Sequence, residues 1–281
     1  MITKKSAAKI DELDRVQLAF DRVAGRMDDV VLLNPINAWM RRVNMTYLRR
    51  TFPPGSRLLE LGCGTGSDAI ELARNGRYVF AIDLSPEMVK VAAEKVTKLG
   101  LQDSVKFTCG RNRDLLELID ESPWKSFDGG YANFSLTYEE SLDGVVRSLS
   151  RLLACGAPFL CTLPNRTVLS ELAIYGPLLR FDRVLWRFQD PLTKDVHGEN
   201  LRIRAYSPWQ VRNAFQPWFR LDKIIGIPTF LPPVYLHQQY RRLISLEQVM
   251  QWMDALLGPR FPWNRLGEHT LYLFQKSAVI P

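Results

Sequence analysis

Cysteine and histidine are scarce in this chain, and their spacing excludes the usual structural metal sites. Only four cysteines and three histidines occur among 281 residues. No two cysteines form the pair Cys-x-x-Cys, and no histidine lies near a cysteine at the spacing of zinc ligands. We therefore expect no metal site, and we interpret the cysteines as reduced thiols of a cytosolic protein.

Long apolar runs are also missing. Residues 1–9 lack the apolar stretch of a secretory signal. The most apolar late segment, residues 224–236, contains three prolines and is too short to span a bilayer. A cytoplasmic location is the resulting prediction.

Positive charge is present but is not concentrated in one region. The formal net charge is +7, and the basic residues spread along the chain with short pairs at 41–42, 49–50 and 241–242. This charge could attract RNA, a lipid surface or a phosphorylated metabolite, although most of it is expected to be solvated. Hydrophobic residues make up 46% and charged residues 24%, which allows a large core without disulfides.

The first 52 residues are predicted to form a helical cap. Apolar residues recur at three- and four-residue steps from 13 to 27, so one stripe must pack on something. A second helical stretch covers about 35–50 and is followed by two prolines and a glycine, which end it. Nothing in this segment indicates catalysis by itself.

From residue 57 the pattern alternates between short apolar runs, which predict strands, and helical segments. This alternation is typical of parallel strands joined by right-handed crossovers. We therefore expect an α/β fold with a doubly wound, Rossmann-like sheet. The predicted strands cover residues 58–61, 78–82, 105–109, 127–134, 158–163, 219–227 and 270–275.

Two connections, residues 164–205 and 228–267, are too long for ordinary loops. We expect both to be helical insertions in a core domain of residues 53–281. Aromatic residues in or near them could wall an apolar pocket that the N-terminal helices complete. These aromatic residues are Trp186, Phe188, Trp209, Phe230, Tyr235, Tyr240 and Trp252.

A glycine-rich turn follows the first predicted strand. Gly62, Gly64 and Gly66 alternate with other residues, and Glu60 stands two residues ahead of the first glycine. A dinucleotide site uses the spacing Gly-x-Gly-x-x-Gly around a pyrophosphate, which a carboxylate would repel. Glu60 instead suits a cationic ligand, such as an amino group beside a sulfonium. Asp83, at the end of the second strand, can accept hydrogen bonds from both ribose hydroxyls.

Residues 59–66 and 81–88 together resemble motif I and the following acidic motif of the class I S-adenosylmethionine-dependent methyltransferases. The resemblance continues at 127–128 and 152–156, and it covers residues 53–163 well. It implies S-adenosylmethionine as the cofactor. It also implies a seven-stranded, mostly parallel sheet with an antiparallel last strand.

The resemblance assigns the cofactor contacts as well. It places adenine near Leu84 and Met88 and against the loop of Arg111 and Asn112, where many relatives carry an aspartate in place of Arg111. The segment 19–28 resembles the start of small-molecule methyltransferases. Structural roles are the alternative for Glu60, as a helix cap, for Asp83, as a strand-end residue, and for Met88, as a core residue. The predicted cofactor-binding residues are Glu60, Gly62, Cys63, Gly64, Gly66, Asp83, Leu84, Met88, Arg111, Asn112, Asn133 and Phe134.

The methyl acceptor is less evident. Methyl transfer from a sulfonium is a one-step displacement that depends on positioning, and a base is needed only where the acceptor must lose a proton. His197, His237 and Tyr138 are the candidate catalytic residues, with surface or structural roles as the alternative for the histidines. The segment 133–138 lacks the Asn-Pro-Pro-Tyr signature of nucleic-acid amino methyltransferases, which counts against a nucleic-acid substrate.

These features are compatible with four functions. The first is methyl transfer to a small organic acceptor, at oxygen, nitrogen or an activated carbon, in biosynthesis such as specialised metabolism. The second is a lipid or quinone methyltransferase at a membrane surface, favoured by the basic pairs and the apolar helices. The third is a non-catalytic partner subunit that binds S-adenosylmethionine, and the fourth is an RNA-binding protein. The oligomeric state is not predicted.

Overall fold

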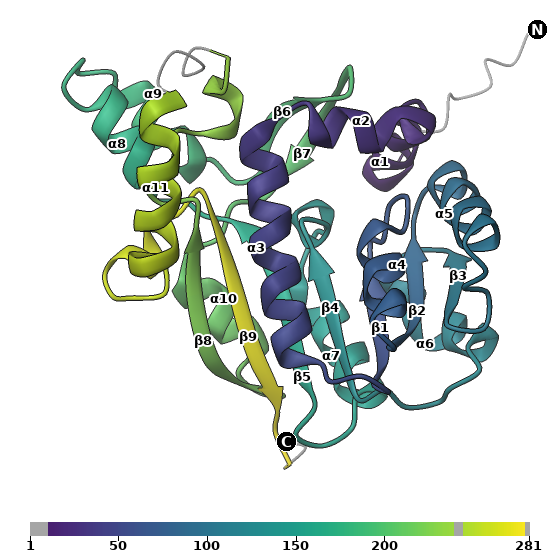
Figure 1. Cartoon of the computed structure of the whole chain (residues 1–281). Helices are drawn as coiled ribbons and strands as arrows, with labels where there is room; N and C mark the ends of the chain where they lie inside the picture. Colours follow the sequence, from purple (N-terminus) through teal and green to yellow (C-terminus); the bar gives the residue numbers. More distant parts are fainter. Residues whose placement is uncertain (1–10, 239–243, 279–281) are drawn as a thin grey trace, which may run out of the picture.

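The computed structural model describes residues 11–238 and 244–278, which form a seven-stranded sheet with helices on both faces (Figure 1). The strand order is β3-β2-β1-β4-β5-β9-β8. The first five strands run parallel, and β9 runs antiparallel to both of its neighbours. The predicted fold class is therefore confirmed. The strands are β1 (Arg57–Leu61), β2 (Tyr78–Asp83), β3 (Val105–Cys109), β4 (Gly129–Asn133), β5 (Pro158–Pro164), β8 (Phe219–Ile227) and β9 (His269–Lys276).

Buried apolar side chains fill both sides of this sheet. On one face, Phe215 stacks on Phe274 with ring centroids 4.1 Å apart, and Phe159 packs beside them. Serine caps begin the helices after β2 and before β8, where the Ser85 and Ser207 hydroxyls accept backbone N–H groups. The crossover helices are α4 (Ser67–Arg74), α5 (Pro86–Lys98), α6 (Leu115–Leu118), α7 (Leu142–Leu152) and α10 (Pro208–Phe215).

The N-terminal segment is helical, as predicted, but its apolar stripe is divided between two helices. A 3₁₀ turn separates them, since the N–H of Val23 bonds to the carbonyl of Phe20. The long third helix begins at Asn34, whose side chain accepts the N–H groups of Ile36 and Asn37, and it packs on the sheet. These elements are α1 (Glu12–Asp21), η1 (Ala24–Arg26), α2 (Met27–Leu32) and α3 (Pro35–Thr51).

The first insertion contains helices, as expected, and also a β-hairpin that the sequence did not predict. Strands β6 (Leu192–Val196) and β7 (Glu199–Ile203) pair across a turn in which His197 and Gly198 have φ angles of 55° and 83°. Positive φ at both central residues matches the twist of paired strands. The helical elements here are α8 (Leu169–Tyr175), α9 (Phe181–Leu185) and η5 (Trp186–Phe188).

The second insertion is helical, as expected. It contains η6 (Val234–Leu236), α11 (Ile244–Leu257) and η8 (Trp263–Arg265). Tyr240 and the basic pair at 241–242 lie outside the described residues. None of the helices in the described part of the chain combines the length and the apolar character needed to cross a membrane.

This architecture gathers the ends of distant segments above one edge of the sheet. The parallel strands β1, β2 and β4 end there, and α1, α2 and the β6–β7 hairpin lie across that edge (Figure 1). The division into a cap of residues 1–52 and a core of residues 53–281 stays a prediction.

Candidate functional site

The glycine turn after β1 is shaped by two close approaches. A Cβ atom on Gly62 would lie 2.2 Å from the Cβ of Ser135, which follows β4. A Cβ atom on Gly66 would lie 2.7 Å from the ring of Phe107 on β3. Both glycines also have positive φ angles, of 72° and 74°. The turn therefore needs glycine at these positions whether or not a ligand is bound.

Asp83 holds this turn in place from the end of β2. Its Oδ2 accepts the N–H of Gly64 at 2.6 Å, and its Oδ1 accepts the N–H of Ser85 at 2.9 Å. Burial raises the pKa of the Asp83 carboxyl, while these backbone hydrogen bonds lower it. Each oxygen keeps acceptor capacity, so the same carboxylate can bind ribose hydroxyls.

Glu60 is a buried acid without a hydrogen-bond partner for its Oε2 in the described part of the chain. Its side chain is only 2% exposed. Burial raises its pKa well above the usual range, and the nearby carboxylates of Asp68 and Asp83 raise it further. A cationic ligand would stabilise the ionised form, so this orphaned oxygen fits the ammonium group of S-adenosylmethionine.

A cavity of about 750 Å³ extends from this turn to the cap and the hairpin. It is lined by every predicted cofactor-binding residue except Gly66, whose space is taken by packing against β3. The lining residues among the predictions are Glu60, Gly62, Cys63, Gly64, Asp83, Leu84, Met88, Arg111, Asn112, Asn133 and Phe134. Met88 is also a core residue, because it packs against Val23 and Ala24 of the cap.

The two residues predicted at the adenine end are engaged differently. Arg111 forms ion pairs with Asp11 at 2.7 Å and with Asp14 at 2.5 Å. Its guanidinium therefore holds the start of α1 against the loop after β3. Asn112 donates from its Nδ2 to Glu139 at 2.8 Å, which leaves its carbonyl oxygen free to accept. Because a guanidinium only donates, Asn112 is the better partner for an adenine amino group.

The end of β4 is fixed by polar contacts and carries a strained residue. Asn133 donates to Asp68 at 2.8 Å and accepts from Asn44 at 3.3 Å. Phe134 has a φ of 61°, a conformation that side chains larger than glycine seldom adopt. The edge of its ring contacts His269, with ring centroids 5.3 Å apart.

Residues 58–156 match the family model described as a methyltransferase domain. The chain carries a class I methyltransferase domain. The match confirms the predicted family and, with it, S-adenosylmethionine as the cofactor of that family.

Two curated relatives of the domain are named for quinone biosynthesis. The chain is 31% identical over 144 residues to the ubiquinone biosynthesis O-methyltransferase of Xylella fastidiosa, an alignment that covers 50% of this chain and 56% of the relative. It is 25% identical to the demethylmenaquinone methyltransferase of Symbiobacterium thermophilum, over 68% of this chain and 74% of the relative. The chain thus spans little more than half the length of the first relative.

A solved structure extends the likeness to the whole fold. The 4+2 cyclase SpnF superposes with a TM-score of 0.61 at 19% identity, covering 98% of this chain and 100% of that one. At this identity the likeness shows the fold alone. The likeness extends over the cap and both insertions as well as the sheet.

Two of the three candidate catalytic residues line the cavity. His197, in the turn of the hairpin, is half-buried and lies edge-on to Phe20 with ring centroids 5.4 Å apart. Burial lowers the pKa of His197, and Arg26 lowers it further. Tyr138 packs against Phe20 as well, and burial raises the pKa of its hydroxyl. These two residues therefore stay candidates.

His237 lies elsewhere. It is not among the residues that line the cavity, and its Nδ1 lies 3.1 Å from Asn34 Nδ2 and 3.2 Å from the carbonyl oxygen of Val234. A role for it in the reaction is not supported by this position.

His269, which the sequence interpretation did not single out, lines the cavity at the start of β9. No described residue hydrogen-bonds to its Nδ1, and burial lowers its pKa to about 3, so it is neutral near pH 7. The predicted order of strands could have indicated that His269 lies near the site. An antiparallel strand begins at the edge where the parallel strands end, and His269 pairs with Pro164 at the end of β5.

The cap is attached directly to the cofactor loops. Asp28 accepts hydrogen bonds from the hydroxyls of Thr65 and Ser67 and pairs with Lys95. Asp21 accepts a hydrogen bond from the hydroxyl of Ser85. The sequence pointed to the segment 19–28 only through resemblance, without indicating these partners.

Proposed function

We propose that the protein transfers the methyl group of S-adenosylmethionine to a small organic acceptor, at oxygen, nitrogen or an activated carbon. The observation that carries this proposal is the single cavity that joins the Glu60–Asp83 end to a second end lined by the cap, the hairpin and β9. Its volume, about 750 Å³, lies in the range of ligand pockets. A donor and an acceptor can therefore meet in one cavity.

The residues at the first end fit the cofactor. Glu60 would hold its ammonium group, Asp83 would accept its ribose hydroxyls, and Leu84 with Met88 would contact adenine. When bound, the cofactor supplies a methyl group activated by its sulfonium. The contribution of the protein is to hold the acceptor in line with that group and to exclude water.

Elements from three parts of the chain bound the acceptor end. Met40 of α3 and Val196 of the hairpin give it apolar walls, and Phe20 of α1 lies toward the adenine end, where it packs with Met88. Lys194 and Glu268 add charged groups of both signs to the same cavity. This combination suits a mid-sized, partly apolar acceptor with a polar group.

His197 is our candidate for the base where the acceptor must lose a proton. Its lowered pKa keeps the imidazole neutral at pH 7, so a ring nitrogen can accept a proton. Tyr138 keeps its own proton because its pKa is raised, so it would position the acceptor as a hydrogen-bond donor.

A quinone-related acceptor is a narrower form of this proposal. It is supported by the names of the two relatives, which are ubiquinone and demethylmenaquinone enzymes. A partner subunit that binds the cofactor without catalysis is the alternative from another class. The cytoplasmic location and the absence of a nucleic-acid substrate stay predictions.

The test is transfer of tritiated methyl from S-adenosylmethionine into a host metabolite extract, followed by identification of the labelled product. We expect a labelled small molecule with the wild-type protein and none with Asp83→Ala, which should bind the cofactor weakly. Cofactor binding by the wild-type protein without any labelled product, with quinone precursors included, would argue for the partner subunit.

A further inference from the structure

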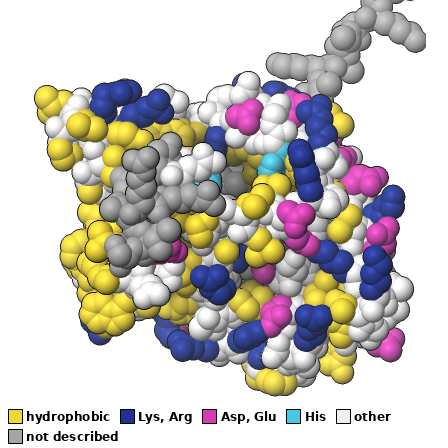
Figure 2. Space-filling model, turned by 45° about the horizontal axis from the view of Figure 1, so that its top comes forward, with side chains coloured by type: hydrophobic (Ala, Val, Ile, Leu, Met, Phe, Trp, Pro, Cys, Tyr) yellow, Lys and Arg dark blue, Asp and Glu magenta, His cyan; other side chains and the backbone are white. Residues whose placement is uncertain are grey.

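The two insertions expose large apolar side chains at one end of the molecule. In the first insertion these side chains are 52–73% exposed, and along α11 they are 37–62% exposed. Figure 2 shows hydrophobic side chains gathered on the side where α8, α9 and α11 lie, with Lys and Arg at the edge. We call this surface the insertion face. It consists of Leu178, Leu179, Phe181, Leu185, Phe188, Leu246, Val249, Trp252 and Leu256.

The side of α11 that faces solvent is apolar. Leu246, Val249, Trp252 and Leu256 follow each other at steps of three and four residues, so they form one stripe along the helix. Single exposed apolar residues are common on protein surfaces, whereas a continuous stripe marks an interaction site. The helix exposes this stripe in addition to its inner apolar side, where Met250 packs against the core.

A buried acid holds α11 in this orientation. Asp254, on the inner side, is 3% exposed and accepts the backbone N–H groups of Thr229, Phe230 and Leu231 at 2.6, 3.0 and 3.2 Å. Turning the apolar stripe inward would expose Asp254 and leave three donors without partners. The outward stripe is therefore enforced by the fold.

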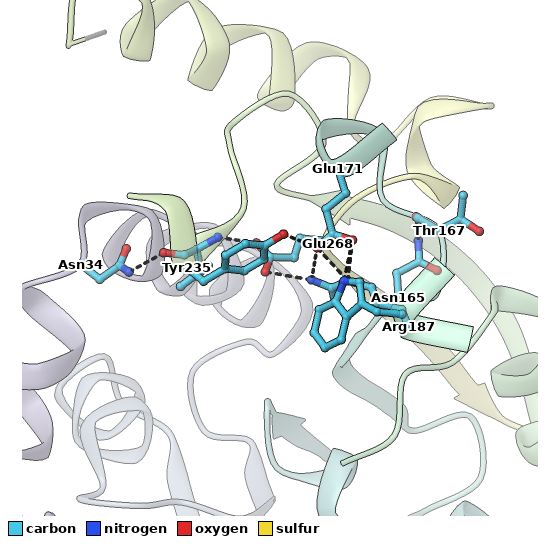
Figure 3. A network of polar contacts seen from close by, with 9 residues as sticks. Asn34, Asn165, Thr167, Glu171, Arg187, Tyr235 and Glu268 are labelled. Carbon is cyan, nitrogen blue, oxygen red and sulfur yellow. Dashed lines mark hydrogen bonds and ion pairs between the residues drawn. The ribbon is translucent and has the colours of Figure 1, made fainter. Parts of the chain in front are cut away.

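The two insertions are joined by a buried polar network (Figure 3). Glu171 of α8 pairs with Arg187 at 2.8 Å, and Arg187 also pairs with Glu268 at 3.2 Å. Tyr235, from the second insertion, donates its hydroxyl hydrogen to Glu171 at 3.2 Å. All three charged side chains are buried. The network holds the first insertion against η6, and Asp254 holds α11 to the segment that precedes η6.

The same network reaches the rim of the cavity. Asn34, between α2 and α3, donates to the carbonyl oxygen of Val234, a residue that lines the cavity. Beside it, Leu32 lines the cavity and is 68% exposed, and Leu33 is 75% exposed. An apolar rim is thus attached to the second insertion by a direct contact.

The charge of the insertions identifies the partner. Around this face, within residues 169–188 and 246–267, four arginines are exposed, against one exposed acid and one half-buried acid. The arginines are Arg180, Arg183, Arg260 and Arg265, and the acids are Asp182 and Glu247. Two copies of such a positive surface would repel each other, whereas an anionic lipid surface attracts it. Exposed Leu, Phe and Trp side chains with Arg beside them are typical of interfacial membrane contacts.

We propose that the insertion face docks on an anionic lipid bilayer and places the rim of the cavity at the membrane surface. Apolar side chains of α9 and α11 enter the boundary between headgroups and acyl chains, and the arginines beside them contact anionic headgroups. This proposal concerns the surface and does not depend on the identity of the methyl acceptor.

The test is flotation with vesicles of phosphatidylcholine alone and of phosphatidylcholine with one part in three of phosphatidylglycerol. We expect the wild-type protein to float with the anionic vesicles and to be released by high salt. The variants Phe181→Glu/Leu185→Glu and Val249→Glu/Trp252→Glu should each bind about tenfold more weakly or worse. The matched control Leu99→Glu/Leu116→Glu, at exposed sites outside the insertions, should bind like the wild type.

A second measurement avoids charged substitutions in case a double variant does not fold. Brominated lipids in the anionic vesicles should quench the fluorescence of the wild-type protein, and they should quench Trp252→Leu less. The proposal is overturned by wild-type protein that floats with neither vesicle, or by insertion variants that float as well as the control. It is also overturned by a wild-type dimer that the insertion variants dissociate in the absence of vesicle binding. Cofactor affinity, measured separately, tests the proposed function without affecting these outcomes.

Discussion

Asp28 in the cap accepts a hydrogen bond of 2.6 Å from the hydroxyl of Thr65 in the glycine turn. The same carboxylate bonds to Ser67 at 3.2 Å and pairs with Lys95, so one acidic side chain joins the cap to the turn and to α5. The partners lower the pKa of Asp28, although burial acts in the opposite direction. The cap is therefore bound directly to the loop that would hold the cofactor.

Asp28→Asn should weaken cofactor binding by loosening the cap. The amide loses the charge that Lys95 and two hydroxyls stabilise, which predicts a dissociation constant about three- to tenfold higher. Isothermal titration with S-adenosylhomocysteine measures it. Asp29→Asn, at the exposed neighbouring position, is the control. Equal affinities for the two variants would show that the Asp28 contact is irrelevant to binding.

Glu60→Gln should have opposite effects on the free and the bound protein. Because the pKa of Glu60 is raised in the folded state, its contribution to stability is present below pH 4.5 and is lost as pH rises toward the folded pKa. The variant, which cannot ionise, should therefore unfold at a higher temperature than the wild type at pH 8. It should also bind the cofactor roughly 10- to 100-fold more weakly. Thermal unfolding with and without cofactor measures the stability and the affinity. Unchanged affinity would contradict the role of Glu60 as the partner of the cofactor's ammonium group.

His197→Gln should separate binding from proton removal. For an acceptor that must lose a proton, we expect kcat to fall by about 10²- to 10⁴-fold with cofactor affinity retained. The lowered pKa predicts a wild-type rate that is constant above pH 6.5 and declines at lower pH, as the base becomes protonated. His237→Gln, outside the cavity lining, should be close to wild type. A variant of His197 with full activity would exclude it as the base.

His269 should make the protein less stable in mild acid. Its pKa is about 3 in the folded protein, against 6.5 for an unperturbed histidine, so the unfolded state binds an extra proton between these values. Stability from this group is complete above pH 6.5 and is lost as pH falls, by at most about 1.4 kcal/mol per pH unit. Urea unfolding of wild type and His269→Gln at pH 7.5 and pH 5 measures the difference. If the free energy of unfolding of the variant depended on pH as that of the wild type does, His269 would not be the cause.

The features that the sequence predicted well are local ones. The strands, the glycine turn and Asp83 were recognisable because strand and helix periods, caps and turns depend on residues a few positions apart. The strand β3, for example, has the predicted bounds, Val105–Cys109. The hairpin was missed because its turn has His197 and Gly198 between strands whose outer sides are polar, which gives a weak apolar pattern.

The sequence by itself determined the kind of domain and the half of the cavity that would hold the cofactor, since Glu60, the glycine turn and Asp83 belong to one strand–turn–helix–strand unit. Only the tertiary structure decided which residues line the other half of the cavity. His269 reaches the cavity because β9 runs antiparallel between β5 and β8, and Asp28 reaches the turn because the cap folds back over it. The outward stripe of α11 likewise depends on Asp254 finding three backbone donors in a distant loop. Contacts between segments far apart in the chain follow from packing, which no local pattern records.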